Sequence, residues 1–266
     1  MDSALSFHQG RLPLLVSIPH AGLRLTPAVA RGLVASARGL PDTDWHIPRL
    51  YSFARELGAS VVAGEYSRFV IDLNRPEDDQ PLYAGATTGL YPATLFDGQP
   101  LFADGMAPAA EERAGCLELI WRPYHEAIQR ELARLREVFG YALLWDAHSI
   151  RSHVPRLFDG ALPDFNFGTF NGASCAPELA ERLLAVCAEA SDYSHVLNGR
   201  FKGGHITRHY GDPQKQVHAV QLELAQRTYM EEAEPFGYRE DLARGTQQVL
   251  ERLLEAMVEW GRQRLA

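Results

Sequence analysis

The sequence predicts an α/β fold, with a mixed, mainly parallel sheet covered by helices on both faces. Short apolar runs that suit buried strands alternate along the chain with longer segments of helical periodicity. Two of these runs, residues 14–18 and 141–145, lead directly into histidines. With 266 residues and 46% hydrophobic residues, the chain is long enough to bury a sizeable core in one α/β domain. We therefore treat residues 1–266 as a single domain.

The expected strands are short runs rich in apolar or β-branched residues. They lie at residues 13–18, 59–63, 67–73, 141–145, 194–197 and 217–224. Between them, the stretches 77–106 and 150–175 have no regular pattern, and 198–211 is expected to be a polar loop. Residues 1–10 form a loosely held lead-in. A long irregular stretch such as 77–106 is often functional, as a lid or a wall of a site.

The expected helices have apolar residues three and four positions apart. They cover residues 26–37, 46–57, 109–139, 177–190 and 238–265. Thr26 suits the N-cap and Pro27 the first turn of one helix, and Gly58 suits the C-terminal end of the next. Pro123 should kink or split the helix over 109–139, because proline lacks the backbone N–H.

Composition and charge exclude several classes of function. The formal net charge is −8 and no basic block is present, which argues against nucleic-acid binding. No apolar run approaches the roughly 18 residues of a spanning helix, and the N-terminus lacks a signal pattern, so no membrane association is expected. The 3 cysteines have no Cys-x-x-Cys spacing and indicate reduced thiols in a cytoplasmic protein.

Two histidines follow or end expected strands, and acidic residues accompany them. His20 and His148, with an acid from Asp42 or Asp44, would supply the three ligands of a catalytic zinc site. Asp146 precedes His148 by two residues on the same face of a strand, so it is placed to orient that histidine or to assist a water. The alternative is that each histidine is a lone, hydrogen-bonded residue in a turn.

Three further segments carry charge in informative places. Arg75 follows the alternating run 67–73 and is placed to bind a carboxylate, unless that run is a solvated edge strand. The segment 199–211 predicts either a cationic pocket for an anionic substrate or a mobile polar loop. Glu223 lies in a mostly apolar strand, where a carboxylate is costly to bury, so it is a candidate general base or the partner of an arginine.

Six motifs, in order, resemble the N-formylglutamate deformylase family over nearly the whole chain. They are SIPHAG (17–22), DTDWH (42–46), SRFVIDLNRPED (67–78), DAHSIRS (146–152), GRFKGGHITRHYG (199–211) and VHAVQLELAQRTYM (217–230). The resemblance implies a cytoplasmic, metal-dependent amide hydrolase of histidine degradation, which releases formate and L-glutamate from N-formyl-L-glutamate. It also implies a phosphorylase/hydrolase-like fold, similar to that of the zinc carboxypeptidases.

The resemblance assigns roles to particular residues. His20 and His148 correspond to two zinc histidines, although other divalent metals also suit such ligands. Leu23 stands where the carboxypeptidases have a glutamate ligand, so the acidic ligand must be Asp42, which we slightly prefer, or Asp44. Glu223 corresponds to the catalytic glutamate.

The anionic substrate would be held by cationic side chains. Asn74 with Arg75 would bind one carboxylate, and Lys202 with Arg208 the other. Arg68 would stabilise the developing oxyanion. The alternatives are a metal-dependent hydrolase of another N-acyl or N-formyl amino acid, and a non-catalytic carboxylate-binding protein. The oligomeric state is not predicted.

Overall fold

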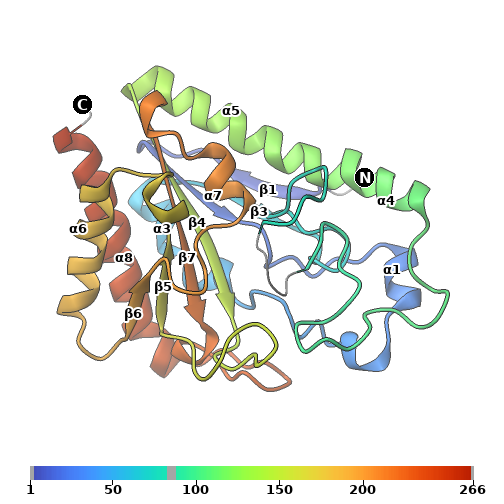
Figure 1. The fold of residues 1–266 in the computed structure, drawn as a ribbon. Helices are drawn as coiled ribbons and strands as arrows, with labels where there is room; N and C mark the ends of the chain where they lie inside the picture. Colours follow the sequence, from blue (N-terminus) through green and yellow to red (C-terminus); the bar gives the residue numbers. More distant parts are fainter. Residues whose placement is uncertain (1–2, 83–87, 265–266) are drawn as a thin grey trace.

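The computed structural model describes residues 3–82 and 88–264. Within them, seven strands form one sheet in the order β1-β3-β2-β4-β7-β5-β6 (Figure 1). The strands are β1 Leu5–His8, β2 Leu14–Ile18, β3 Ser60–Gly64, β4 Ala142–Ile150, β5 Phe165–Gly168, β6 His195–Leu197 and β7 Val217–Ala225. Strands β3, β2, β4 and β7 are mutually parallel, as are β5 and β6, whereas β1 and β5 run antiparallel to β3 and β7. The predicted mixed, mainly parallel sheet is confirmed.

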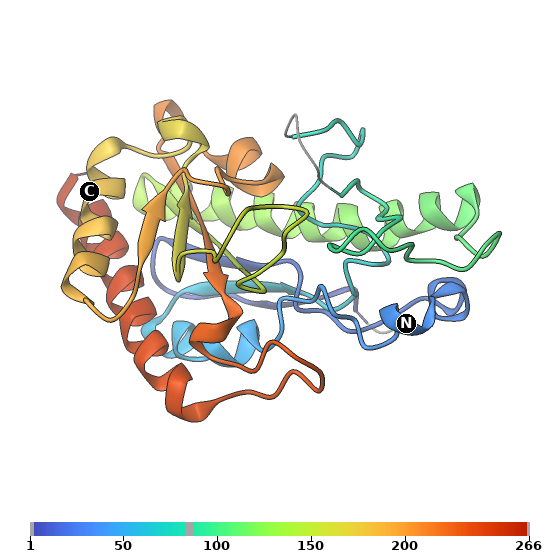
Figure 2. The same cartoon turned by 60° about the horizontal axis from the view of Figure 1, so that its bottom comes forward.

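Helices cover both faces of this sheet (Figures 1 and 2). The α-helices are α1 Pro27–Gly32, α2 Ile47–Leu50, α3 Phe53–Leu57, α4 Ala110–Cys116, α5 Arg122–Phe139, α6 Pro177–Glu189, α7 His205–Tyr210 and α8 Glu240–Arg264. Short helical turns are η1 Ala35–Ala37, η2 Leu117–Trp121, η3 Phe170–Gly172, η4 Pro213–Lys215 and η5 Gln226–Thr228. Helices α2, α3, α6 and α8 pack on one face, and α1, α5 and α7 pack on the other.

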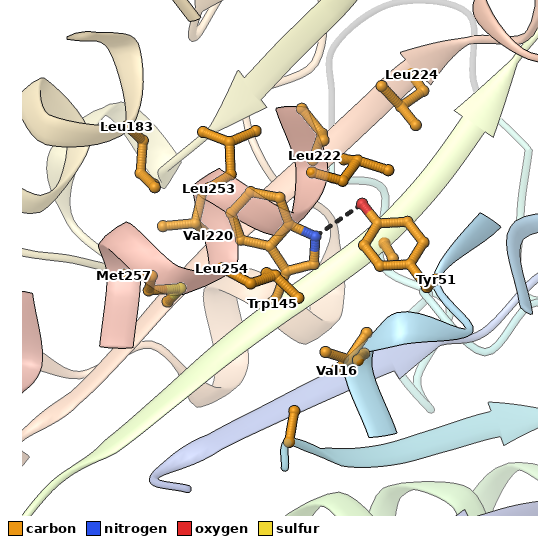
Figure 3. Close-up of a cluster of buried hydrophobic side chains, with 14 of the residues drawn as sticks. Val16, Tyr51, Trp145, Leu183, Val220, Leu222, Leu224, Leu253, Leu254 and Met257 are labelled. Carbon is orange, nitrogen blue, oxygen red and sulfur yellow. Dashed lines mark hydrogen bonds between the residues drawn. The ribbon is translucent and has the colours of Figure 1, made fainter. Parts of the chain in front are cut away.

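Strand β4 lies between β2 and β7 and divides the two cores by its alternation. Leu143 and Trp145 point into the core under α6 and α8, whereas Ala142 and Leu144 point toward α5. Figure 3 shows the Trp145 ring within the first of these cores, where its Nε1–H donates to the Tyr51 hydroxyl at 2.9 Å. The core packing therefore uses the whole indole, including its polar atom.

Two expectations for the first third of the chain were wrong. Residues 1–10 are not a loose lead-in throughout, because Leu5–His8 pairs with β3 as an edge strand. The run 67–73 is not a strand. Its backbone makes turn and loop hydrogen bonds, such as the one from the Val70 N–H to the Ser67 oxygen. Phe69, Val70, Ile71 and Leu73 of this run join one core, whereas Arg68 and Asp72 form an ion pair.

The helices also differ from expectation in length. The helix expected over 26–37 ends at Gly32 and is followed by a 3₁₀ turn, and the one expected over 46–57 is two short helices. The helical segment is not split at Pro123, because α4, η2 and α5 follow one another without a gap. Trp121, the residue before α5, is itself helical, so Pro123 lies inside this segment, directly after the π-helical turn η2.

In the second half, β4 extends five residues past its expected end to Ile150, so Asp146 and His148 lie within the strand. Strand β5 lies inside the stretch expected to be irregular, and α7 inside the expected loop 198–211. None of the described helices is both long and apolar enough to cross a membrane. The prediction that residues 1–266 form a single domain stays a prediction. Of the stretch 77–106, which was expected to be irregular, residues 83–87 lie outside the described residues.

Candidate active site

The face of the sheet under α5 changes from apolar to polar toward the carboxyl ends of the parallel strands. Aligned residues form successive rows across β2, β4 and β7. The first row is Leu15, Leu144 and Ala219, the second is Ser17, Asp146 and Gln221, and the last, on β4 and β7, is His148 and Glu223. Ligands of open α/β sheets bind at this end of the strands, so the polar rows mark a site.

A buried cluster of three potential metal ligands lies at this end. His20, Asp44 and His148 each offer one ligand atom, and these atoms all lie within 4.8 Å of one another. Asp44 Oδ2 is 3.0 Å from His148 Nδ1 and 3.8 Å from His20 Nδ1. Among the described residues, His20 Nδ1 and Asp44 Oδ1 are buried without a hydrogen-bond partner. Unpaired buried polar atoms are costly, and a cation between them would satisfy both.

The opposite nitrogens of both imidazoles are held by other side chains. His20 Nε2 is 2.7 Å from Asp72 Oδ1, and His148 Nε2 is 3.2 Å from Asp146 Oδ2. Asn74 Nδ2 also lies 2.9 Å from His148 Nε2. Carboxylates behind the far nitrogens of histidine ligands fix the ring orientation and leave the near nitrogens available to a metal. Both rings therefore present Nδ1 toward Asp44.

Local structure brings these three residues together. His20 follows the end of β2 by two residues, and His148 lies near the end of the adjacent strand β4. Asp44 comes from the loop before α2, where its backbone N–H donates to the His20 oxygen at 3.1 Å. The Ser149 N–H also donates to Asp44 Oδ2 at 3.2 Å. Asp44 is therefore held by hydrogen bonds with backbone groups at His20 and next to His148.

The charges around the cluster shift several pKa values. Burial and the nearby Arg68 charge lower the pKa of His20, which favours the neutral imidazole that a metal requires. Burial also acts to lower the pKa of His148, but the Asp146 and Asp44 carboxylates outweigh it and hold that pKa well above its usual value. Without a cation, the cluster therefore holds a proton on His148.

Glu223 faces the cluster from β7, opposite His148 in the register. Its side chain is nearly buried, and burial raises its pKa to about 8. Gln221 Nε2 donates a long hydrogen bond to Glu223 Oε2 at 3.4 Å. A carboxylate with a raised pKa beside a group of metal ligands is suited to accept and return a proton.

Arg68 connects the cluster to the pocket above it. Its Nη2 donates to Asp72 Oδ2 at 2.8 Å, and its Nη1 is 3.6 Å from Asp44 Oδ1. Its guanidinium carbon lies 4.7 Å from the centre of the Phe96 ring. Burial acts to lower the pKa of Arg68, but the carboxylates of Asp72 and Asp44 raise it, so the side chain is charged.

The pocket brings together most, but not all, of the residues expected at the site. His20, Arg68, Asn74, Arg75, His148 and Glu223 line it. Asp42 is not part of the ligand cluster. Its Oδ1 pairs with Arg151 Nη2 at 3.1 Å, and its Oδ2 accepts from the Phe96 N–H at 2.8 Å. The geometry therefore favours Asp44 over Asp42 as the acidic ligand, against our slight preference.

Four other expected residues lie outside the lining of this pocket: Asp44, which belongs to the ligand cluster, and Asp146, Lys202 and Arg208. Asp146 is buried behind His148, where Ser17 Oγ donates to it at 3.2 Å. Arg208 donates from Nε to the Gly203 oxygen at 2.8 Å and from Nη1 to the Leu82 oxygen at 3.0 Å.

Comparison with known proteins agrees with this arrangement. The family described as N-formylglutamate amidohydrolase matches residues 12–230, which include every residue of the cluster. The chain belongs to the N-formylglutamate amidohydrolase family. It is 77% identical to an N-formylglutamate deformylase of Pseudomonas putida over 264 residues, which are 99% of either chain. It is 69% identical to an N-formylglutamate deformylase of Pseudomonas aeruginosa over 266 residues, 100% of both chains.

A solved structure supports the fold. The crystal structure of N-formylglutamate amidohydrolase from Ralstonia eutropha JMP134 matches with a TM-score of 0.85, covering 98% of this chain and 99% of that one. The sequence identity is 22%, so this likeness concerns the fold. The family model and the two Pseudomonas relatives identify this chain as a hydrolase. Four features of its site were not predicted from the sequence.

The first two are Asp72 and Gly204, which support predicted residues. Asp72 was placed on the polar side of a strand but not at the site, and nothing in the sequence marks it as the partner of His20. Gly204 packs on Asn74 so closely that a Cβ atom would lie 2.3 Å from Asn74 Nδ2. Its N–H donates to Gln221 Oε1 at 2.6 Å. Only glycine fits this approach of α7 to the site.

The third feature anchors the segment that carries Asn74 and Arg75. Trp121 Nε1–H, at the end of η2, donates to the Arg75 oxygen at 3.0 Å. His125 Nε2 donates to the Leu73 oxygen at 2.9 Å, and the two rings stack with centroids 3.8 Å apart. Burial lowers the pKa of His125 to about 3, so this imidazole is neutral. The π-helical turn before α5 therefore positions this segment of the pocket.

The fourth feature is Arg200, which lines the pocket although neither Lys202 nor Arg208 does. Its Nε donates to the Leu157 oxygen at 2.6 Å. The three cationic residues lie within one segment of nine residues, and their spacing does not reveal which of them turns toward the strands.

Proposed function

We propose that this chain is a zinc-dependent deformylase that hydrolyses N-formyl-L-glutamate to formate and L-glutamate. The observation that carries the proposal is the buried cluster of His20, Asp44 and His148, with Glu223 beside it. The names of the two Pseudomonas relatives support the choice of substrate. The charge of the pocket supports it as well, because arginines line a site that would receive a substrate with two carboxylates.

The donor set of the cluster fits zinc. Two imidazole nitrogens and one carboxylate oxygen are the protein ligands of several catalytic zinc sites, which keep another position open. His20 Nδ1 and Asp44 Oδ1 have no hydrogen-bond partner among the described residues, so the cluster contains ligand atoms that a cation would satisfy. When bound, zinc would supply positive charge that polarises the formyl oxygen and makes a water more acidic.

Glu223 performs the proton transfers in this proposal. It takes a proton from the attacking water and delivers it to the nitrogen of the departing glutamate. Its carboxylate needs a high proton affinity for this role, which burial provides. Positive charge supplied by a bound cation would keep the carboxylate ionised at the start of the reaction.

Two arginines act on the substrate. Arg68 holds a fixed positive charge at the wall of the pocket near Asp44, where it would stabilise the negative charge that develops on the formyl oxygen. Arg75, with Asn74, would bind a substrate carboxylate. Asp146 acts only through His148, as a positioning residue, because it lies behind the imidazole.

The proposal is tested by formate release from N-formyl-L-glutamate. We would measure the purified protein, the same protein after chelator treatment, and the treated protein after one equivalent of zinc, with the bound metal quantified in each sample. Activity should disappear with the chelator and return with zinc. Full activity in a sample without metal would contradict the metal-dependent mechanism, and zinc-loaded protein that releases no formate would contradict the substrate.

A further inference from the structure

The pocket contains an apolar wall beside its polar floor. Phe96, Ile150, Leu157 and Phe201 line it, and all four belong to one small hydrophobic cluster, which is separate from the two cores of the sheet. The polar floor is formed by the residues at the ends of β2, β4 and β7. A ligand of this pocket therefore meets charge on one side and hydrocarbon on another.

Two guanidinium groups lie against this wall. The Arg68 carbon is 4.7 Å from the centre of the Phe96 ring, and Arg68 also contacts Asp44 of the ligand cluster. The Arg200 carbon is 5.5 Å from the centre of the Phe201 ring, and Arg200 Nε donates to the Leu157 oxygen at 2.6 Å. Arg68 thus lies at the part of the wall next to the ligand cluster. Arg200 lies at the part that Leu157 and Phe201 form.

The surroundings of Arg75 are different. Its Nε donates to the Thr88 oxygen at 2.6 Å, and Asn74 precedes it in the chain, next to His148. Polar groups therefore surround Arg75, and its neighbour contacts a residue of the ligand cluster. In an N-formyl amino acid the α-carboxylate is two bonds from the amide nitrogen, whereas a glutamate side chain puts two methylene groups before its own carboxylate.

We propose that Arg200 binds the side-chain carboxylate of the substrate and is the residue that makes the enzyme prefer an acidic side chain. The apolar wall contacts the two methylene groups, and Arg75 with Asn74 binds the α-carboxylate. The bond from Arg200 Nε to the Leu157 oxygen fixes the plane of the guanidinium beside the apolar wall. This inference rests on the proposed deformylase function.

The test compares two substrates that differ only in the charge of the side chain, N-formyl-L-glutamate and N-formyl-L-glutamine. In the zinc-loaded wild type, kcat/KM should be about 100-fold higher for the glutamate substrate, as expected for a charged pair in a partly buried site. Arg200→Gln should lower kcat/KM for the glutamate substrate about 100-fold, and for the glutamine substrate by no more than about threefold.

Three variants serve as comparisons. Arg75→Gln should lower kcat/KM for both substrates by the same factor, because both have the α-carboxylate. Arg200→Lys keeps the charge and should retain part of the preference for glutamate, even if Arg200→Gln folds poorly. Arg156→Gln removes the same charge from an exposed position next to Leu157 and should change neither value. Equal losses on both substrates in Arg200→Gln, or no loss on glutamate, would overturn the proposal.

A binding measurement separates this inference from the deformylase function itself. Calorimetry with L-glutamate and L-glutamine should show that the zinc-loaded wild type binds L-glutamate more tightly, and that Arg200→Gln abolishes the difference. If the wild type releases no formate, the proposed substrate fails, but loss of this difference would still support the role of Arg200. Equal binding of both amino acids by the wild type would overturn it.

Discussion

The two faces of strand β4 are equally buried but have opposite chemistry. Trp145 and Ala147 face α6 and α8 in a core made of apolar side chains. Asp146 and His148, their neighbours in the chain, face the other side and form part of the ligand cluster and its support. All four have relative exposures of 2% or less, so burial alone does not distinguish the two faces.

The two faces differ in the polar atoms next to β4. On the apolar face, Trp145 Nε1 donates to the Tyr51 hydroxyl. On the polar face, His20 Nδ1 and Asp44 Oδ1 lack a hydrogen-bond partner among the described residues. A protein keeps such atoms buried only at a cost in folding free energy. We infer that the apolar face stabilises the fold. The polar face lowers the stability of the fold, because its unpaired buried atoms are kept for a function.

The largest expected effect is on catalysis from the polar face. Glu223→Gln keeps the shape of the side chain but cannot accept a proton, so kcat should fall by roughly 10³-fold. Zinc content and the melting temperature should change little, because Glu223 is not a proposed ligand. Measurement of kcat together with bound zinc would check this. Retention of more than a tenth of kcat would exclude Glu223 as the base.

The second effect concerns the apolar face. Trp145→Ala should lower the free energy of unfolding by about 3–5 kcal/mol, since it removes a large buried ring and a hydrogen bond. The folded fraction should still bind zinc with the affinity of the wild type. Denaturant titration and zinc titration test the two statements separately. Loss of zinc affinity without loss of stability would contradict the division between the two faces.

The third effect is a pH dependence of stability on the polar face. Burial raises the pKa of Glu223 from 4.5 to about 8, so between these values the folded metal-free protein keeps a proton that the unfolded chain has lost. The contribution of the Glu223 carboxyl group to the free energy of unfolding is complete below pH 4.5 and is lost as the pH rises through about 8.

Chelator-treated wild type should therefore lose roughly 4 kcal/mol more stability over this range than chelator-treated Glu223→Gln, in which the group cannot titrate. Denaturant titration at several pH values would measure the difference. Parallel curves for the two proteins would show that the carboxyl group does not have a raised pKa.

The smallest effect tests the anchor of the segment that carries Asn74 and Arg75. Trp121→Phe keeps the stacked ring but removes the N–H that donates to the Arg75 oxygen, a bond that contributes about 1 kcal/mol. KM for N-formyl-L-glutamate should rise about fivefold, with little change in kcat. Trp260→Phe is the matched control, because Trp260 Nε1 is buried without a hydrogen-bond partner among the described residues. An equal change in both variants would exclude the anchor.

The sequence predicted the parts of the fold that depend on hydrophobic periodicity. It located β2, β4 and β7, because burial on both faces of a parallel sheet leaves mostly apolar runs. It failed at 67–73, where polar and apolar residues alternate without a strand. Arg68 and Asp72 face the site while Phe69 and Ile71 face a core, and the backbone hydrogen bonds are made with loops.

The sequence was less informative about individual site residues. His20 and His148 were identified because histidines at strand ends are unusual in apolar runs. Asp42 and Asp44 are two positions apart in one loop, and only the three-dimensional path of that loop shows which one reaches the histidines. For the same reason Arg200 could not be distinguished from Lys202 and Arg208.

The most direct test of the proposed metal ligands compares Asp44→Asn with Asp42→Asn. Each variant would be loaded with zinc and desalted, and its bound zinc and formate release from N-formyl-L-glutamate would be measured. We predict that Asp42→Asn retains about one zinc per chain and its activity, and that Asp44→Asn loses both. Zinc and activity that persist in Asp44→Asn but disappear in Asp42→Asn would contradict the assignment of the cluster.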